Sequence, residues 1–293
     1  MNKGIRLAFF TASISGFSIF ASKFFIASID AVLFTTLKNV FVAVILSILV
    51  YCVHKQKLYE LTKKQWKQLI LIGLIGGSIP FALFFMGLSQ ITAMEGALIH
   101  KTLFIWVAIM SVIFLQEKLN RYQIFGYLAV TLGALLLGGV SYKTIGMGHA
   151  MVALATLFWS IEYIIAKKAL KSIPPVIVAW ARMFFGVFIL LGITLFQGSI
   201  TQIITLGSTQ ILAIISGSVF LLGYVLTWYS ALSKAPTSSV SLVLATSPII
   251  TGFLSAIFIS HNFPQAQILG WVMIIGGVAV TLLFGRFKQN LAL

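Results

Sequence analysis

Glu162 and Lys101 carry opposite charges inside apolar stretches, where charged side chains are rare. An ionisable group at the centre of a membrane helix costs roughly 2.5–3.5 kcal/mol on insertion scales, so it is a candidate functional residue. At about 1.5 Å of helix rise per residue, the two differ in depth by about 10 Å, which strains a direct ion pair. A bound zwitterion would bridge that gap, with its ammonium at Glu162 and its carboxylate or phosphate at Lys101. The structural alternative is a pair that serves only the fold, or a Lys101 held neutral by burial.

Aromatic and small polar residues accompany the two charges. Aromatic side chains beside a carboxylate can hold an ammonium by cation–π contact, although in membrane helices they more often pack or form interfacial belts. Ser18 falls at the position of Glu162 in the internal repeat described below, so it either lines the same site or packs between helices. His100 is either a hydrogen-bonded packing residue or part of the site. The candidate binding residues besides Glu162 and Lys101 are therefore Trp159, Tyr163, Trp228, Tyr224, Phe81, Ser18 and His100.

Lys38 and Arg182 are two further cations within apolar stretches. We expect each of them about 10 Å from one membrane surface, one in each vestibule, where they could gate access. The alternative is that both side chains extend to the lipid headgroups. Three deep cations against one deep anion favour a zwitterionic or anionic ligand over a cation.

The elements that must position these residues are membrane-spanning helices. Of the 293 residues, 60% are hydrophobic and 9% are charged, far from the roughly 25% charged residues of a soluble domain. About 20 apolar residues span a bilayer as a helix. The sequence predicts an all-α integral membrane protein with ten transmembrane helices, at about residues 5–26, 31–52, 68–89, 93–115, 122–140, 148–168, 175–196, 209–232, 237–259 and 266–285.

Glycine and proline interrupt two of these stretches. Gly73, Gly76, Gly77 and Pro80 in the third predict close packing and a kink, and Pro248 does the same in the ninth. The single Cys52 and four dispersed histidines show no metal-ligand spacing, so we expect neither a metal nor a cofactor.

The basic residues predict the orientation, because Lys and Arg concentrate on the cytoplasmic side of membrane proteins. If both termini are cytoplasmic, fifteen of the twenty basic residues fall on that side, and Lys143 is the main one outside. The net charge of +15 then reflects loops that face anionic lipid, and no nucleic-acid partner is needed. We expect a multi-pass protein of the cytoplasmic membrane. The fifteen residues are Lys3, Arg6, Lys55, Lys57, Lys63, Lys64, Lys67, Lys118, Arg121, Lys167, Lys168, Lys171, Lys234, Arg286 and Lys288.

The chain repeats itself at an offset of 144 residues, without a gap. Gly4 falls on Gly148, Gly73 on Gly217 and Thr102 on Thr246, with further identities as far as Gly133 on Gly277. The sequence thus predicts two five-helix repeats, residues 1–144 and 145–293. An odd number of helices inserts the second repeat upside down relative to the first. Inverted repeats are typical of secondary transporters, with the substrate site near the membrane midplane between them.

Three stretches resemble the EamA family of ten-helix carriers in the drug/metabolite transporter superfamily. They are Phe114–Leu119 at the junction of helices 4 and 5, Ala245–Ile250 around a mid-helix proline, and Ala155–Trp159 leading to Lys167-Lys168. The resemblance covers the whole chain. It implies a membrane carrier of small metabolites, a family that includes amino-acid exporters, and it does not identify the substrate.

The leading functional prediction is a secondary transporter, and not an enzyme, that moves a small polar, amino-acid-like metabolite by alternating access. A coupling proton or a counter-substrate, and a homodimer, stay open as further partners. One alternative is an uptake carrier for a nucleotide-like or S-adenosyl metabolite. An alternative of another class is an integral-membrane transferase, which would need paired acids with a metal or a His–Asp dyad.

The orientation predicts the accessibility of two loops. A cysteine at position 63 should react with impermeant reagents only from the cytoplasmic side, and a cysteine at position 143 only from outside. Labelling of intact cells and of inverted vesicles tests both positions, with Cys52 replaced to remove the native thiol. Labelling of position 63 in intact cells would refute the orientation.

Overall fold

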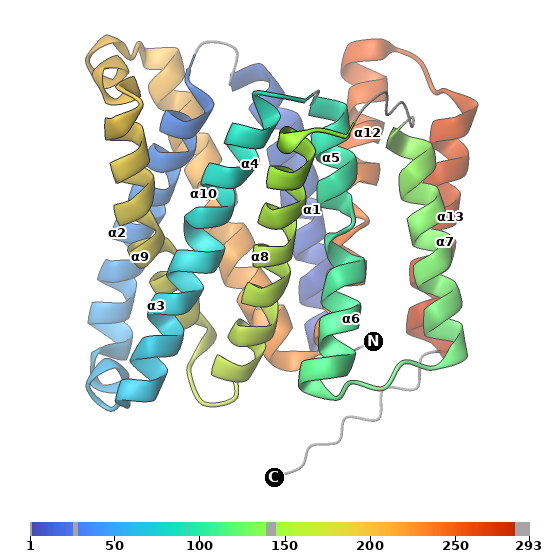
Figure 1. Cartoon of the computed structure of the whole chain (residues 1–293), viewed down its shortest axis with the longest axis horizontal. Coiled ribbons are helices and arrows are strands. Elements are labelled where there is room, and N and C mark those ends of the chain that lie inside the picture. Colours follow the sequence, from blue (N-terminus) through green and yellow to red (C-terminus); the bar gives the residue numbers. More distant parts are fainter. Residues whose placement is uncertain (1, 26–28, 92, 139–144, 285–293) are drawn as a thin grey trace.

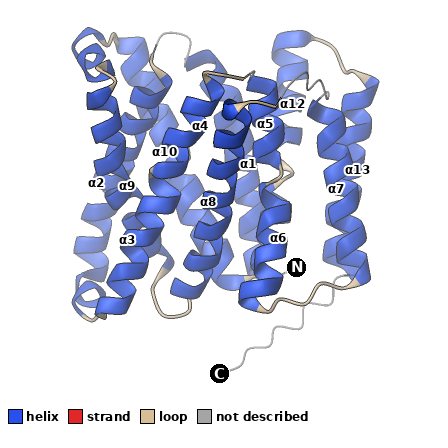
Figure 2. Ribbon diagram, in the orientation of Figure 1, coloured by secondary structure: helices blue, strands red, loops and turns tan. Residues whose placement is uncertain are grey.

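The computed structural model describes residues 2–25, 29–91, 93–138 and 145–284, and these residues form helices joined by short loops. Figures 1 and 2 show the helices side by side, with their axes roughly parallel. The all-helical fold predicted from the sequence is confirmed within these ranges. The elements are α1 (Lys3–Phe25), α2 (Ala31–Tyr59), α3 (Lys63–Gly77), α4 (Ile79–Leu88), α5 (Ala93–Lys101), α6 (Leu103–Leu115), α7 (Arg121–Gly138), α8 (Met147–Ala169), α9 (Pro175–Phe196), η2 (Ser199–Thr205), α10 (Ser208–Lys234), α11 (Thr237–Leu244), α12 (Ser247–Ser255), η3 (Ala256–Ser260) and α13 (Gln265–Phe284).

Nine helical segments of the described chain are long and apolar enough to cross a membrane, and Arg121–Leu137 is a shorter apolar helix. Three of the nine combine elements that follow one another directly: α3 with α4, α5 with α6, and α11 with α12 and η3. Together with the shorter helix they correspond to the ten apolar stretches of the sequence. Lys143, Arg286 and Lys288, which entered the prediction of orientation, lie outside the described residues.

The helix boundaries repeat at the same spacing as the sequence. α1 and α8 begin at Lys3 and Met147, and α5 and α11 begin at Ala93 and Thr237, in each case 144 residues apart. α2 and α9, α6 and α12, and α7 and α13 begin at the same spacing. In Figure 1, α1 runs from the lower to the upper end of the molecule, whereas α8 runs downward. Corresponding helices therefore run in opposite directions.

Two membrane-spanning helices are interrupted at corresponding threonines. α5 and α6 meet at Thr102, whose hydroxyl donates to the Ile99 carbonyl at 2.7 Å. Between α11 and α12, the Thr246 hydroxyl donates to the Val243 carbonyl at 2.8 Å. The third span is interrupted at Ser78, where φ is −143°, whereas its counterpart α10 is continuous from Ser208 to Lys234. The kinks that Pro80 and Pro248 predict thus coincide with breaks between helices.

The two halves of the chain interlock. The third helix of each half packs against the first two helices of the other half: α3 against α8 and α9, and α10 against α1 and α2. α7 packs along α13, and this pair lies at one edge of the bundle in Figure 1. This exchange of the third helices places residues of both halves at shared interfaces.

Glycines bring α7 and α13 into backbone contact. A Cβ on Gly277 would lie 2.6 Å from the Gly126 carbonyl oxygen, and a Cβ on Gly133 would lie 2.7 Å from the Gly270 carbonyl oxygen. Gly126 and Gly270 are repeat partners, as are Gly133 and Gly277. Small residues of this kind let membrane helices approach closely, where dispersion contacts hold them together.

Charged side chains hold the corner between α10 and α11. The Lys167 ammonium donates to the carbonyl oxygens of Leu232 at 2.6 Å and Ala235 at 2.7 Å, near the C-terminal end of α10. The Glu117 carboxylate accepts from the backbone N–H groups of Thr237 at 2.7 Å and Ser238 at 3.1 Å, at the start of α11. The helix dipole places partial negative charge at a helix C-terminus and partial positive charge at an N-terminus. A cation at the first and an anion at the second are therefore both stabilising. Glu117 is thus a helix cap at this junction.

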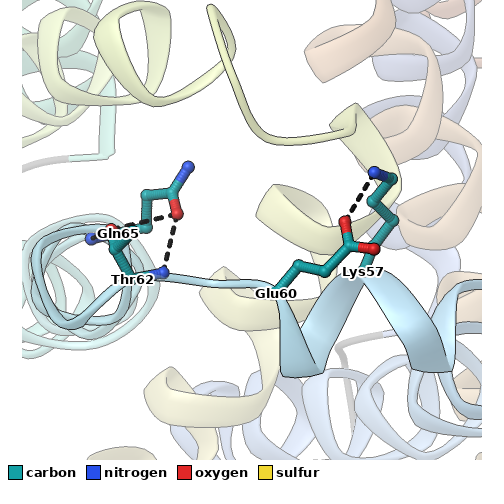
Figure 3. A network of polar contacts seen from close by, with 4 residues as sticks. All are labelled: Lys57, Glu60, Thr62 and Gln65. Atoms are coloured by element: carbon teal, nitrogen blue, oxygen red, sulfur yellow. Dashed lines mark hydrogen bonds and ion pairs between the residues drawn. The ribbon is translucent and has the colours of Figure 1, made fainter.

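The lysine-rich connection between α2 and α3 is ordered by local polar contacts (Figure 3). Lys57 forms an ion pair with Glu60 at 2.7 Å. Thr62 caps α3, because its hydroxyl accepts from the Gln65 N–H while the Gln65 side chain accepts from the Thr62 N–H at 2.8 Å. A reciprocal cap of this kind fixes where a helix begins.

Adjacent glycines in α13 provide a matched test of the α7–α13 contact. We expect Gly277→Ala to lower the apparent melting temperature in detergent, because its Cβ would meet the α7 backbone. Gly276→Ala should be neutral or stabilising, because a Cβ there meets no atom within 4 Å and alanine favours a helix by about 1 kcal/mol over glycine. Equal effects of the two substitutions on thermal unfolding would contradict the role of Gly277.

Candidate functional site

The strongest candidate site is the buried carboxylate of Glu162 in α8. Glu162 has no solvent-accessible surface, and its Oε1 accepts a hydrogen bond from the Tyr229 hydroxyl of α10 at 2.6 Å. Within the described part of the chain, its Oε2 has no hydrogen-bond partner. Since buried polar atoms are almost always paired, an unpaired carboxylate oxygen makes Glu162 a candidate binding residue.

Arg182 of α9 supplies the positive charge next to Glu162. The carboxyl carbon of Glu162 and the Nε of Arg182 lie 2.9 Å and 3.3 Å from one point, the position that a Cβ on Gly76 would occupy. The two groups carry opposite charges, yet among the described residues no salt bridge within 4.0 Å joins them. Arg182 Nε likewise has no hydrogen-bond partner among the described residues. The pair thus presents one free acceptor and one free donor.

The Gly76 carbonyl of α3 holds the surrounding side chains in place. Its oxygen accepts from Trp159 Nε1 at 3.1 Å and from Arg182 Nη2 at 3.2 Å, and both bonds are buried. A side chain on Gly76 is excluded, because its Cβ would lie 2.4 Å from Glu162 Cγ. At the neighbouring Gly77, a Cβ would overlap the Arg182 carbonyl oxygen. The cluster therefore joins α3 of the first half to α8 and α9 of the second.

Aromatic rings surround Trp159. Its ring centroid lies 5.2 Å from Phe81, 5.6 Å from Phe84 and 4.8 Å from His100, in edge-on or tilted arrangements. The rings come from α4, α5 and α8, which places His100 among the aromatic residues. Its Nδ1 is buried without a hydrogen-bond partner in the described structure. This group of rings adjoins Glu162, because Trp159 and Glu162 are three residues apart on one helix face.

A second aromatic group forms between α8 and α10. The Tyr163 ring lies 4.4 Å from the Trp228 ring, and Tyr224 stacks on Trp228 with an interplanar angle of 8° and 6.4 Å between centroids. Trp228 is fully buried, and its Nε1 has no hydrogen-bond partner among the described residues. Tyr224 is half-buried. Trp228 directly precedes Tyr229, the residue that donates to Glu162.

Lys101 and Lys38 are not bonded to Glu162 in the described structure. Lys101 is half-buried at the end of α5, next to the break at Thr102, and no described hydrogen bond or ion pair links it to Glu162. Lys38 of α2 lies over the Phe34 ring at 4.3 Å and packs against Gly217 of α10. Ser18 of α1 is half-buried.

Arg182 differs most from the sequence expectation. The sequence predicts a vestibule residue, but only 7% of its surface is exposed, and its guanidinium lies beside Glu162. A position along α9 does not show which helix a side chain faces. α9 approaches α3 closely at Gly77, and the Arg182 guanidinium donates to the Gly76 carbonyl of α3. The sequence does not single out Tyr229, because α10 carries several other hydroxyl residues and nothing along the chain marks this one as the partner of Glu162.

The charged pair predicts a specific pattern of stability. Arg182→Gln should destabilise the protein by on the order of 3 kcal/mol, because it leaves the Glu162 carboxylate buried without a neighbouring cation. The double variant Glu162→Gln/Arg182→Gln should lose less than the sum of its single variants. Thermal unfolding in detergent measures all three.

Lys38→Met is the matched control for Arg182→Gln, because Lys38 is the repeat partner of Arg182 and lies over an aromatic ring. We expect a smaller effect for it. Strict additivity of the two site substitutions would show that Glu162 and Arg182 are not coupled.

Comparison with known proteins gives a consistent result over the whole length. The chain matches the EamA-like transporter family twice, over residues 2–139 and 146–283. It is 23% identical over 284 residues to the uncharacterized transporter YetK of Bacillus subtilis (strain 168), covering 92% of this chain and 84% of YetK. An uncharacterized transporter of Archaeoglobus fulgidus is 23% identical, with 96% of this chain and 98% of that protein covered.

A crystal structure shares the fold. It superposes with a TM-score of 0.78 at 16% sequence identity, and the match covers 99% of this chain and 100% of that chain. At this level of identity the likeness concerns the fold alone.

Proposed function

The chain belongs to the EamA-like transporter family, and on that premise we propose that it is a secondary carrier of a small polar metabolite, working by alternating access. The observation that carries the proposal is the Glu162–Arg182 pair. It is buried where α3 of one half meets α8 and α9 of the other, and it keeps one acceptor and one donor unpaired. Burying charged groups inside a membrane costs free energy, so a buried pair with unpaired atoms is a candidate ligand-binding site.

The arrangement of the two halves supports alternating access. The repeat boundaries, the reversed direction of corresponding helices and the interlocked third helices together describe two inverted units that share one interface. Discontinuous helices at corresponding positions of the two halves, here at Thr102 and Thr246, are a recurrent sign of a transporter binding site. Rocking of one unit against the other would expose the Glu162 region first to one side of the membrane and then to the other.

The charges favour a zwitterionic or anionic, amino-acid-like substrate. Glu162 Oε2 would accept from an ammonium group, and Arg182 Nε would donate to a carboxylate or phosphate. Lys101, half-buried at the Thr102 break, would add a second cation along the substrate path. The stacked Tyr224 and Trp228 rings would also suit a nucleotide-like or S-adenosyl substrate, which is the alternative transport proposal.

The basic loops support a location in the cytoplasmic membrane with both termini inside. Direct contacts gather these loops at one end of the bundle. Gln65 donates to Ser172 at 3.0 Å, which joins the α2–α3 and α8–α9 connections, and Asn2 donates to the Lys234 carbonyl at 3.2 Å. Figure 1 shows these connections at the same end as the start of α1. Positive charge gathered at one end favours that end as the cytoplasmic one.

Transport by reconstituted protein tests the proposal. Purified protein in proteoliposomes should take up or release one class of small polar metabolite in a screen by uptake and counterflow. Glu162→Gln should reduce that transport by about tenfold or more, as expected for the loss of a charged hydrogen bond, while the protein still inserts. Lys101→Met should reduce it as well.

Lys64→Met is the control, because Lys64 is exposed at the start of α3, away from the cluster. Normal transport by both Glu162→Gln and Lys101→Met would remove this site assignment and leave only the family membership.

A further inference from the structure

Pro80 lies four residues after Gly76, the residue whose carbonyl holds the charged cluster. In an α-helix the carbonyl of each residue accepts from the N–H four residues later. Proline has no N–H, and its ring pushes away the carbonyl four residues before it. The helix breaks between the two residues, because α3 ends at Gly77 and α4 begins at Ile79. The Gly76 carbonyl therefore has no intrahelical donor.

Two donors from the other half of the chain occupy this vacated acceptor. Trp159 Nε1 and Arg182 Nη2 approach the Gly76 oxygen to 3.1 Å and 3.2 Å, so both of its lone pairs are used. Buried carbonyls must find such partners, since the bilayer interior offers no water. With Nη2 held by Gly76, the guanidinium stays beside Glu162 without closing onto it, and Nε and Oε2 stay unpaired.

The second half of the chain has no corresponding proline and no corresponding helix break within the described residues. The repeat partners of Gly76 and Pro80 are Phe220 and Tyr224, and α10 runs through them without a break. Lys38, the partner of Arg182, contacts the Phe34 ring instead of a carbonyl. Within the described structure, Arg182 donates to a backbone carbonyl that a helix break leaves without its helical donor. Its repeat partner Lys38 does not.

We propose that Pro80 and Gly76 are positioning residues: by freeing the Gly76 carbonyl, Pro80 holds Arg182 and Trp159 in the geometry that keeps the Glu162–Arg182 pair open to substrate. This inference rests on the proposed transport function for its purpose, but its geometric part can be measured separately. An alanine at position 80 restores the N–H that a helix would place on the Gly76 oxygen, so it competes with both side-chain donors.

The first experiment is a double-mutant cycle on thermal stability, which needs no substrate. Trp159→Phe removes the indole N–H and should lower the apparent melting temperature in the native background by more than in the Pro80→Ala background, where the carbonyl has its own donor. Trp228→Phe is the matched control, because it removes a buried indole of the same size whose Nε1 has no partner. Its effect should be the same in both backgrounds. Pro248→Ala, in α12, should leave the cost of Trp159→Phe unchanged.

The second experiment measures transport by Pro80→Ala in proteoliposomes, using the substrate that the metabolite screen identifies. We expect KM to rise by about tenfold, as for a lost charged hydrogen bond, with a smaller change in kcat. A proline that only shapes the helix would change kcat or the amount of folded protein and leave KM unaltered.

The outcomes separate this inference from the proposed function. An equal cost of Trp159→Phe in both backgrounds would overturn the role of Pro80 whether or not the protein transports anything. Coupling together with an unchanged KM would overturn the positioning of substrate, and coupling in a protein that transports no metabolite would leave the geometry standing and sink the transport proposal. If Pro80→Ala does not fold, Pro80→Gly restores the same N–H. Failure of both to fold would assign Pro80 to the fold and overturn its role in the site.

Discussion

A single backbone carbonyl, that of Gly76, fixes the geometry on which the rest of the candidate site depends. It accepts from Trp159 and Arg182, which belong to two different helices of the other half of the chain. Inside a bilayer no water can satisfy a carbonyl that leaves its helix, so partners must come from the protein. The glycine is equally necessary, since a side chain there would overlap Glu162. The hydrogen bonds to this one carbonyl thus join α3, α8 and α9 around the buried carboxylate.

The two halves of the chain share a plan but differ in chemistry. Helix starts, threonine breaks and glycine contacts recur at 144 residues, so the backbone arrangement is duplicated. The buried carboxylate and the helix break beside it are not duplicated, because Ser18 is the repeat partner of Glu162 and a continuous α10 corresponds to the broken α3–α4 pair. In the proposed transport cycle, such a scaffold would present the Glu162 region alternately to the two sides of the membrane.

The contacts at the α10–α11 corner show where this mostly apolar protein places some of its few charged side chains. Glu117 and Lys167 satisfy backbone groups at the ends of two helices, and Arg182 satisfies another at a helix break. In each case a charged group meets backbone atoms that helix geometry leaves unpaired. Glu117, Lys167 and Arg182 therefore pair with backbone groups, whereas one carboxylate oxygen of Glu162 has no partner in the described structure.

The sequence by itself determined the helical membrane fold, the ten apolar segments and their repeat, because these depend on local composition and on a fixed spacing along the chain. It also made Glu162 a candidate, because a carboxylate within an apolar stretch is visible from composition alone. It also placed the kinks, since Pro80 and Pro248 act on their own helices. Only the tertiary structure decided that Arg182, rather than Lys101, is the cation beside Glu162, and that Tyr229 donates to it. These helices are apolar on nearly every side, so hydrophobic periodicity does not reveal which face of one helix meets which face of another. The faces of α3, α8 and α9 that meet are set by the close approach at Gly76 and Gly77. They are also set by the hydrogen bonds that the Gly76 carbonyl accepts from the other half of the chain.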